Sequence, residues 1–184
     1  SLMKIIPTAI ADVFIIEPEV FKDSRGFFLK SWNQASFNKI ISKDITFVQD
    51  NHSHSFRGVL RGLHYQINHP QGKLVRVISG RVLDVAVDIR RSSPTFGCCV
   101  SVEITGDNYK QLWIPAGCAH GFVVLSQEAD FFYKTTDYYY PEHEKCIKYN
   151  DSDLNIDWKM DKNKIILSDK DCCGLPFSQA EYYE

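Results

Sequence analysis

Short runs of β-branched and aromatic residues recur along the chain, separated by clusters of turn-forming residues. The runs cover residues 13–16, 27–31, 47–52, 59–65, 74–78, 81–88, 99–104, 111–114, 121–125 and 131–135. Turn signals such as Asn-His-Pro-Gln-Gly at 68–72 lie between them. Within 81–88, the acids Asp84 and Asp88 share one face, as in a half-buried strand. Many short strands with few helices predict an all-β fold, a jelly-roll barrel.

We expect only short helices. The clearest candidate covers residues 33–41, with Ser31 able to cap its first turn, and a second lies near 178–183. No internal repeat, low-complexity tract or linker divides the sequence, so residues 1–184 are expected to form a single domain. Ser1 and Leu2 precede Met3 and resemble an expression scar, which makes Met3 the expected natural start.

Composition narrows the class of protein. The 184 residues are 44% hydrophobic and 24% charged, which is ordinary for a globular chain with its own core. A net charge of −2 gives no electrostatic reason to expect a nucleic-acid partner. No apolar run approaches the ~20 residues of a membrane helix, and the N-terminus lacks a signal-peptide pattern. We therefore expect no membrane partner and a cytoplasmic location.

The spacing of the six cysteines argues against a structural metal site. Cys98 and Cys99 are adjacent, as are Cys172 and Cys173, and the other two, Cys118 and Cys146, stand apart. Structural zinc sites usually pair cysteines two to four residues apart. We expect free thiols that fill small apolar sites.

Two histidines follow turns on separate predicted strands. His64 lies in Arg-Gly-Leu-His-Tyr-Gln at 61–66, and His120 ends Pro-Ala-Gly-Cys-Ala-His at 115–120. A lone strand histidine is typically a hydrogen-bonded structural residue, but these two segments resemble the paired motifs of cupins, which often hold a metal. In that pattern Gln66 replaces the second histidine, and Lys73 stands where the acid would be.

An ammonium group repels a divalent cation, so we predict an acid–base site without a metal. In such a site Lys73 could stabilise the oxygen of an enolate, although a lysine at a barrel rim can also simply extend to solvent.

From residue 25 to residue 171 the chain resembles the dTDP-4-dehydrorhamnose 3,5-epimerase family. The matching strings are 61–66, Gln-Gly-Lys-Leu-Val-Arg-Val at 71–77, Asp-Val-Ala-Val-Asp-Ile-Arg at 84–90, Ser-Pro-Thr-Phe-Gly at 93–97, Trp-Ile-Pro at 113–115, Ala-His-Gly-Phe at 119–122, Tyr-Lys at 133–134 and Ser-Asp-Lys-Asp at 168–171. The resemblance implies a cupin-type jelly-roll barrel that acts in dTDP-rhamnose biosynthesis, for lipopolysaccharide or O-antigen.

The resemblance also implies the reaction. The family's substrate is a thymidine-diphospho 4-keto-6-deoxy-hexose, whose ketone acidifies the C3 and C5 hydrogens. His64 matches the proton-abstracting base, Asp171 the carboxylate paired with it, Tyr133 the acid on the opposite face, and Lys73 the cation beside the enolate. No cofactor is implied, in agreement with the absence of a glycine-rich dinucleotide motif.

The remaining matches concern substrate binding. Arg25, Arg61, His120 and Lys170 match residues chiefly around the diphosphate, and Tyr139 matches the tyrosine that stacks on thymine. The other matched contacts are Phe27, Lys30, Gln49, Asp50, Asn51 and Glu144. In the family, the early arginine is thought to reach a neighbouring subunit's site, so the resemblance implies a homodimer with a subunit-crossing Arg25.

Three residues depart from the family pattern. Lys30 stands where the family commonly has Glu, which reverses a charge near the expected nucleotide site and bears on which base or sugar is bound. Cys99 replaces a common tryptophan and Cys118 a common aromatic residue, which indicates local repacking.

Other functions share parts of this pattern. A 3-epimerase, or an enzyme acting on another 4-keto sugar nucleotide, would carry the same residues. A metal-dependent cupin oxygenase would require a bound transition metal, against which Gln66 and Lys73 argue. A barrel that only binds a sugar nucleotide would have no turnover to lose when His64 is replaced.

Overall fold

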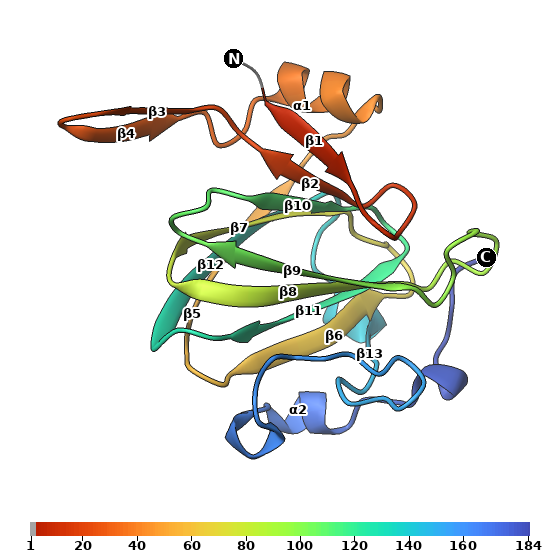
Figure 1. Ribbon diagram of the computed structural model, residues 1–184. Coiled ribbons are helices and arrows are strands. Elements are labelled where there is room, and N and C mark those ends of the chain that lie inside the picture. The colour runs from red at the N-terminus through yellow and green to blue at the C-terminus, as the bar shows by residue number, and fades with distance from the viewer. Residues whose placement is uncertain (1–2) are drawn as a thin grey trace.

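Two antiparallel β-sheets face each other in the computed structural model, which describes residues 3–184 (Figure 1). The first sheet has six strands in the order β1-β2-β10-β7-β12-β5. Its strands are β1 (Lys4–Pro7), β2 (Phe14–Glu17), β5 (Gln49–Phe56), β7 (Lys73–Ser79), β10 (Gln111–Ile114) and β12 (Glu128–Thr135). Ser1 and Leu2, the expected expression scar, lie outside the described residues.

The second sheet has five strands in the order β13-β6-β11-β8-β9. Its strands are β6 (Leu60–Gln66), β8 (Arg81–Asp88), β9 (Cys99–Thr105), β11 (Cys118–Val124) and β13 (Glu144–Cys146). Strands distant in the sequence pair within both sheets, as in a jelly roll. The prediction of an all-β barrel with few helices is confirmed.

The space between the sheets is filled by branched and aromatic side chains. Phe122 on β11 and Phe131 on β12 stack across the interior with ring centroids 3.9 Å apart. Around them pack buried residues of both sheets, including Val75, Val82 and Ala86. This apolar contact fixes how far apart the two sheets stand.

The outer face of each sheet is also covered in part. Helix α1 (Gln34–Ile41) buries Phe37 and Ile41 against the six-stranded sheet. Its N-cap is Asn33, whose side chain accepts a hydrogen bond from the Ser36 amide, so the expectation of a Ser31 cap is wrong. The segment after β13 packs against the five-stranded sheet, with Trp158 buried there.

Strand β8 differs from the half-buried strand expected from its pattern. Asp84 and Asp88 are fully buried, because β8 is interior to its sheet and both of its faces are covered. Leu83, Val85 and Val87 pack under the C-terminal segment. In a strand that is buried on both faces, the alternation of polar and apolar residues no longer marks one face as exposed.

Several short elements lie outside the predicted runs. These are β1, β3 (Val20–Asp23), β13 and the helix α2 (Asp169–Cys172). Near 178–183 the chain forms only a 3₁₀ turn, Phe177–Gln179. Neither α-helix within residues 3–184 has the length and apolar character needed to cross a membrane.

All six cysteines are free thiols, as expected. Cys118 is buried in the interior core, but Cys98, Cys172 and Cys173 are exposed. The expectation that the thiols fill apolar sites is therefore wrong for those three.

Candidate functional site

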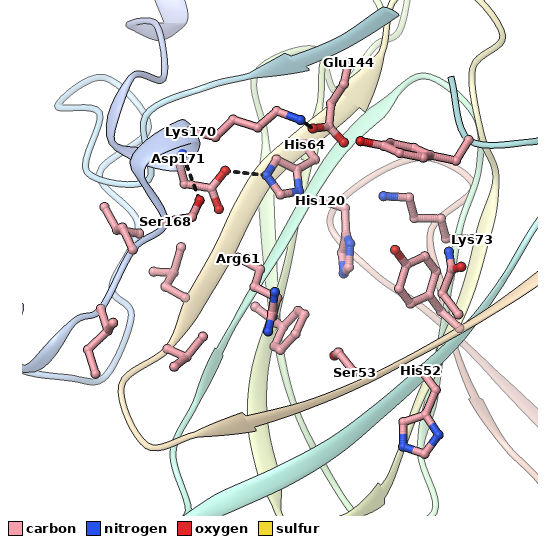
Figure 2. A pocket seen from close by; sticks show the side chains of 18 of the residues that line it. His52, Ser53, Arg61, His64, Lys73, His120, Glu144, Ser168, Lys170 and Asp171 are labelled. Atoms are coloured by element: carbon pink, nitrogen blue, oxygen red, sulfur yellow. Dashed lines mark hydrogen bonds and ion pairs between the residues drawn. The ribbon is translucent and has the colours of Figure 1, made fainter. Parts of the chain in front are cut away.

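A cavity of about 660 Å³ is lined by both sheets and by the C-terminal segment around α2. Figure 2 shows His64 and Asp171 on one side of it and Lys73 on the other, with His120 between them. The lining residues that the sequence had singled out are Gln49, Asn51, Arg61, His64, Lys73, His120, Tyr133, Tyr139, Glu144, Lys170 and Asp171. Strand pairing thus gathers residues that are up to 122 positions apart, from Gln49 to Asp171.

His64 and Asp171 form a close pair at the wall of the cavity. His64 Nε2 lies 2.6 Å from Asp171 Oδ1, and the two side chains are 27% and 5% exposed. Asp171 is set by α2, whose N-cap Ser168 accepts a hydrogen bond from the Asp171 amide. Burial alone would raise the pKa of Asp171, but hydrogen bonds and charge from His64, together with the Gly62 amide, lower it below its usual range. Asp171 is therefore a carboxylate that can hold one tautomer of His64 and stabilise its protonated form.

Gly62 donates its backbone amide to Asp171 at a point where β6 lies close against β11. Its amide donates to Asp171 Oδ2 at 3.1 Å, with a backbone φ of +127°. A Cβ at this position would lie 2.6 Å from Gly121 Cα, so a side chain does not fit. Both oxygens of Asp171 are thus oriented, one by His64 and the other by the main chain.

Lys73 is a buried cation on β7. Its residue is 8% exposed, and burial lowers its pKa to about 8, partly offset by the negative charges of Glu144 and Asp84. Its Nζ lies 5.5 Å from the centroid of the Tyr133 ring. At neutral pH the ammonium form is still favoured, so Lys73 can stabilise a developing negative oxygen in the cavity.

His120 is the partner of His64 across the β6–β11 pair. Its Nε2 lies 2.6 Å from Asp84 Oδ1, and both side chains are nearly inaccessible to solvent. Burial lowers the pKa of His120 and raises that of Asp84. A neutral imidazole held in one orientation is the result, and it can hydrogen-bond to a ligand in the cavity.

Tyr133 comes from β12, in the sheet that faces His64. Burial raises the pKa of its phenol, partly offset by a hydrogen bond with Asn51. The phenol is therefore protonated at neutral pH and able to donate a proton.

Strand β5 lines the cavity chiefly with alternate residues, Gln49, Asn51 and Ser53, and also with His52. Gln49 and Asn51 line it, and their side chains are joined by a hydrogen bond of 2.9 Å. Asp50 lies between them and projects to the opposite face of the sheet, where it pairs with Lys134 at 3.0 Å. Of these three predicted contacts, Asp50 is thus placed away from the cavity.

Charged side chains lie at the edge of the cavity near α2. Lys170 and Glu144 form an ion pair there (Figure 2). Arg61 lies across from them and donates two hydrogen bonds to Ser55 Oγ, at 3.0 and 3.2 Å. Fixed cations of this kind can hold the oxygens of a phosphate group.

Three predicted binding residues lie away from this cavity, on or just after the hairpin of β3 and β4 (Gly26–Leu29). The hairpin projects away from the barrel (Figure 1). Arg25 at its tip has a side chain that is 88% exposed and pairs with Asp23. Phe27 is exposed on β4, and Lys30, just after it, lines a separate hollow beside α1.

Several cavity residues were not predicted from the sequence. They include His52, Ser53, Phe122, Ile166, Leu167 and Ser168, and Asp84 supports His120 from behind. The alternation of β5 would have indicated Ser53, which is in phase with Gln49 and Asn51. Ser168 carries a capping signal, Ser followed three residues later by Asp171, but the helix that it caps is only four residues long.

The donors expected of a metal-binding cupin do not fit a metal here. Both polar atoms of the Gln66 amide already form hydrogen bonds to backbone groups of neighbouring loops: Nε2 donates to the His69 carbonyl at 2.7 Å, and Oε1 accepts from the Tyr140 amide at 2.8 Å. Lys73 places a buried cation where a carboxylate ligand would be needed.

Known proteins share this sequence and structure along almost the entire chain. The family model of dTDP-4-dehydrorhamnose 3,5-epimerase matches residues 7–179. A dTDP-4-dehydrorhamnose 3,5-epimerase of Pseudomonas aeruginosa is 55% identical over 181 residues, covering 98% of this chain and 99% of the relative.

Two solved structures show the same similarity. The enzyme of that name from Elizabethkingia anophelis has a TM-score of 0.95 at 48% identity, covering 99% of this chain and 100% of its own. A dTDP-6-deoxy-D-glucose-3,5-epimerase from Legionella pneumophila, solved in complex with dTDP-4-keto-L-rhamnose, has a TM-score of 0.94 at 50% identity, covering 97% and 95%. On this evidence the chain belongs to the dTDP-4-dehydrorhamnose 3,5-epimerase family.

Proposed function

We propose that the protein inverts C3 and C5 of a thymidine-diphospho 4-keto-6-deoxy-glucose to give dTDP-4-dehydro-L-rhamnose. The observation that carries the proposal is that His64 and Tyr133 reach one cavity from facing sheets, with the buried Lys73 beside Tyr133. A base and an acid on opposite sides of a sugar ring are what inversion at carbon requires. Family membership and the sugar nucleotide in the Legionella structure support the choice of substrate.

His64 begins the reaction by removing the C3 proton. Asp171 receives the Nε2–H of the imidazole, which leaves Nδ1 as the basic nitrogen, and stabilises the imidazolium that forms. The electrons of the broken C–H bond move onto the C4 oxygen. Lys73 stabilises that oxygen as an enolate, because its ammonium is largely buried at the wall of the cavity.

Tyr133 then returns a proton to the opposite face of the same carbon. His64 then releases its proton to solvent and Tyr133 takes one up from solvent, after which the same pair repeats the exchange at C5, next to the same ketone. Each step moves a proton and leaves the oxidation state of the sugar unchanged, so the proposal involves no redox cofactor.

The nucleotide half binds at the rim. Lys170, Arg61 and His120 contact the diphosphate, and Tyr139, 47% exposed, stacks on the thymine. Gln49 and Asn51 contact the nucleoside side of the ligand, and Glu144 makes a further contact through its position beside Lys170.

The reaction is tested by turnover of the 4-keto-6-deoxy-glucose nucleotide in heavy water, followed by NMR. Deuterium at both C3 and C5 is the expected result, and deuterium at C3 alone would assign a 3-epimerase instead. His64→Ala should lose the exchange and keep thymidine diphosphate binding. His69→Ala is the matched control, since His69 is 48% exposed and pairs with Asp137 on the surface. Normal exchange by the His64→Ala protein would refute the role of His64.

We further propose a homodimer in which Arg25 of each subunit completes the site of the other. The exposed hairpin supports this, since Phe27 and Phe28 are 58% and 66% exposed, and clustered exposed aromatics favour an interface. Phe27 and Lys30 would then lie near the partner's nucleotide.

Mixing two inactive variants tests the crossing. If Arg25 acts across the dimer, exchanged subunits of Arg25→Ala and His64→Ala recover about a quarter of the activity, because half of the dimers are mixed and each has one intact site. If Arg25 acts within its own subunit, the mixture stays inactive.

A cytoplasmic location and a role in supplying rhamnose for surface glycans complete the proposal. The free thiols support the location, because adjacent unpaired cysteines are typical of a reducing compartment.

A further inference from the structure

Cys146 lies directly behind the His64–Asp171 pair. Strands β13 and β6 are antiparallel, and Cys146 is the residue opposite His64. Opposite residues in such a pair project to the same face of the sheet. The Cys146 Sγ is 3.8 Å from Asp171 Oδ1 and 3.6 Å from the carbonyl oxygens of Gly62 and Ile147.

These three side chains bring together an imidazole, a thiol and a carboxylate. A His64 nitrogen, the Cys146 sulfur and an Asp171 oxygen all lie within 4.8 Å of one another. Zinc takes all three ligand types at about 2.0–2.3 Å, so tetrahedral ligands sit roughly 3.3–3.7 Å apart. The Cys146–Asp171 separation of 3.8 Å is close to this range, His64 and Asp171 need to part by about 1 Å from their 2.6 Å contact, and the His64 nitrogen is within 4.8 Å of the Cys146 sulfur.

We propose that His64, Cys146 and Asp171 form an inhibitory binding site for a thiophilic divalent cation such as Zn²⁺ or Cd²⁺. The site is separate from the metal position of a cupin interior, which would be built from His64, Gln66, Lys73 and His120. Cation binding stands on the geometry alone, and only its inhibitory effect rests on the proposed function.

The chemistry of binding explains the inhibition. The ion bonds to the Cys146 sulfur, an Asp171 oxygen and His64 Nε2. The thiol proton is released to solvent, and the Nε2 proton of His64 moves to Nδ1. Both ring nitrogens are then occupied, so His64 has no lone pair with which to remove a proton from the sugar.

The surroundings suit a cation that displaces a proton. A thiol is protonated at neutral pH, so one proton is released when the ion bonds to the Cys146 sulfur. The nearest other charges, Lys170 and Glu144, neutralise each other in an ion pair. The partly exposed His64 gives the ion a route from the cavity.

Cadmium titration of the purified protein tests the site without any substrate. Charge-transfer absorption from thiolate to cadmium in the ultraviolet reports the bond between cadmium and sulfur. Proton release into a weakly buffered solution gives the number of protons released per ion bound. We expect one Cd²⁺ bound with one proton released. Cys146→Ser should weaken binding by more than about tenfold, as should Cys146→Ala, which removes the serine hydroxyl as a substitute ligand.

The matched control removes the two exposed thiols that follow Asp171 in the sequence. A Cys172→Ser/Cys173→Ser variant should bind Cd²⁺ as the unmodified protein does. The site is refuted if the Cys146 variants bind normally, if the control loses binding, or if the unmodified protein shows no thiolate absorption.

Inhibition is measured separately, as loss of C3 exchange with rising Zn²⁺, relative to each variant's own uninhibited rate, and its reversal by a chelator. If the protein binds Cd²⁺ as expected but turns over no sugar nucleotide, the proposed function fails and the cation site stands. If it turns over but Zn²⁺ inhibits the Cys146 variants equally, the inhibitory role fails.

Discussion

Replacing Asp171 with Asn tests the proposed mechanism most directly. The change keeps the size of the side chain but replaces one oxygen by an NH₂ group. The Gly62 amide donates to Oδ2, so it holds the remaining oxygen on its own side. The NH₂ group must then face His64 Nε2, where Oδ1 now lies at 2.6 Å. A donor at that position selects the tautomer with the proton on Nδ1, which is the wrong one for a base.

The magnitude follows from two effects. Losing a hydrogen bond to a charged group costs about 1.5–3 kcal/mol, or roughly 10- to 150-fold in rate. A wrong tautomer adds to this: the same Asp-to-Asn change in the serine protease triad lowers kcat by about 10⁴. We therefore expect Asp171→Asn to slow C3 exchange by about 10²- to 10⁴-fold.

Deuterium incorporation at C3, measured by NMR in heavy water, is the assay. Thymidine diphosphate affinity and the thermal midpoint show that the variant still folds and binds. Asp169→Asn is the matched control, with the same loss of charge on an exposed residue two positions away. If Asp171→Asn kept its rate within threefold while folded, the hydrogen bond to His64 would have no part in the reaction.

Four further results are expected. Tyr133→Phe should still exchange the C3 hydrogen with solvent but form product at least ~100-fold more slowly, which NMR of the same sample measures; equal losses of both would contradict its role as the acid. Because burial lowers the pKa of Lys73 to about 8, kcat/KM should fall as the pH rises through 8, and Lys73→Arg should lose that limb. The same lowered pKa makes the free energy of unfolding rise between pH 8 and 10.5, because the unfolded chain binds the proton more tightly there. A free energy of unfolding from urea titrations that falls over this range would refute the burial of Lys73. Gly62→Ala should lower the free energy of unfolding, measured in urea, by at least ~2 kcal/mol, because the added Cβ clashes with Gly121 and the backbone is strained. Gly26→Ala is the comparison: its φ is +133° but nothing lies within 4 Å of an added Cβ, so its effect reports the backbone strain without the clash.

Local patterns were enough to predict the fold class and most strands. The runs at 99–104 and 111–114 coincide with β9 and β10, because their β-branched and aromatic residues favour strands and both runs pair with neighbouring strands in the fold. Strand β13 was missed, since three residues carry no period, and its pairing with β6 depends on a loop that returns from far along the chain. The same pairing places Cys146 opposite His64, a contact with no signal in the sequence.

The site residues divide by the origin of the signal. His64, His120 and Lys73 could be singled out because their spacing follows the paired motifs of cupins, with Lys73 at the position of the acid. Asp84 could not, because its contact with His120 depends on the register between β8 and β11. Asp50 was matched to a binding position of the family, but a strand sends consecutive side chains to opposite faces, and in the structure its neighbours Gln49 and Asn51 line the cavity while Asp50 pairs with Lys134.

The stack of Phe122 on Phe131 has a consequence for the chirality of the product. In the proposed mechanism the base and the acid belong to different sheets, and these two rings hold the sheets apart. The handedness of each new carbon centre then depends on apolar packing deep in the protein, as well as on the residues that carry protons. A smaller side chain at Phe131 would let the sheets approach each other and change the ratio of epimers formed, even with every proton-transfer residue in place.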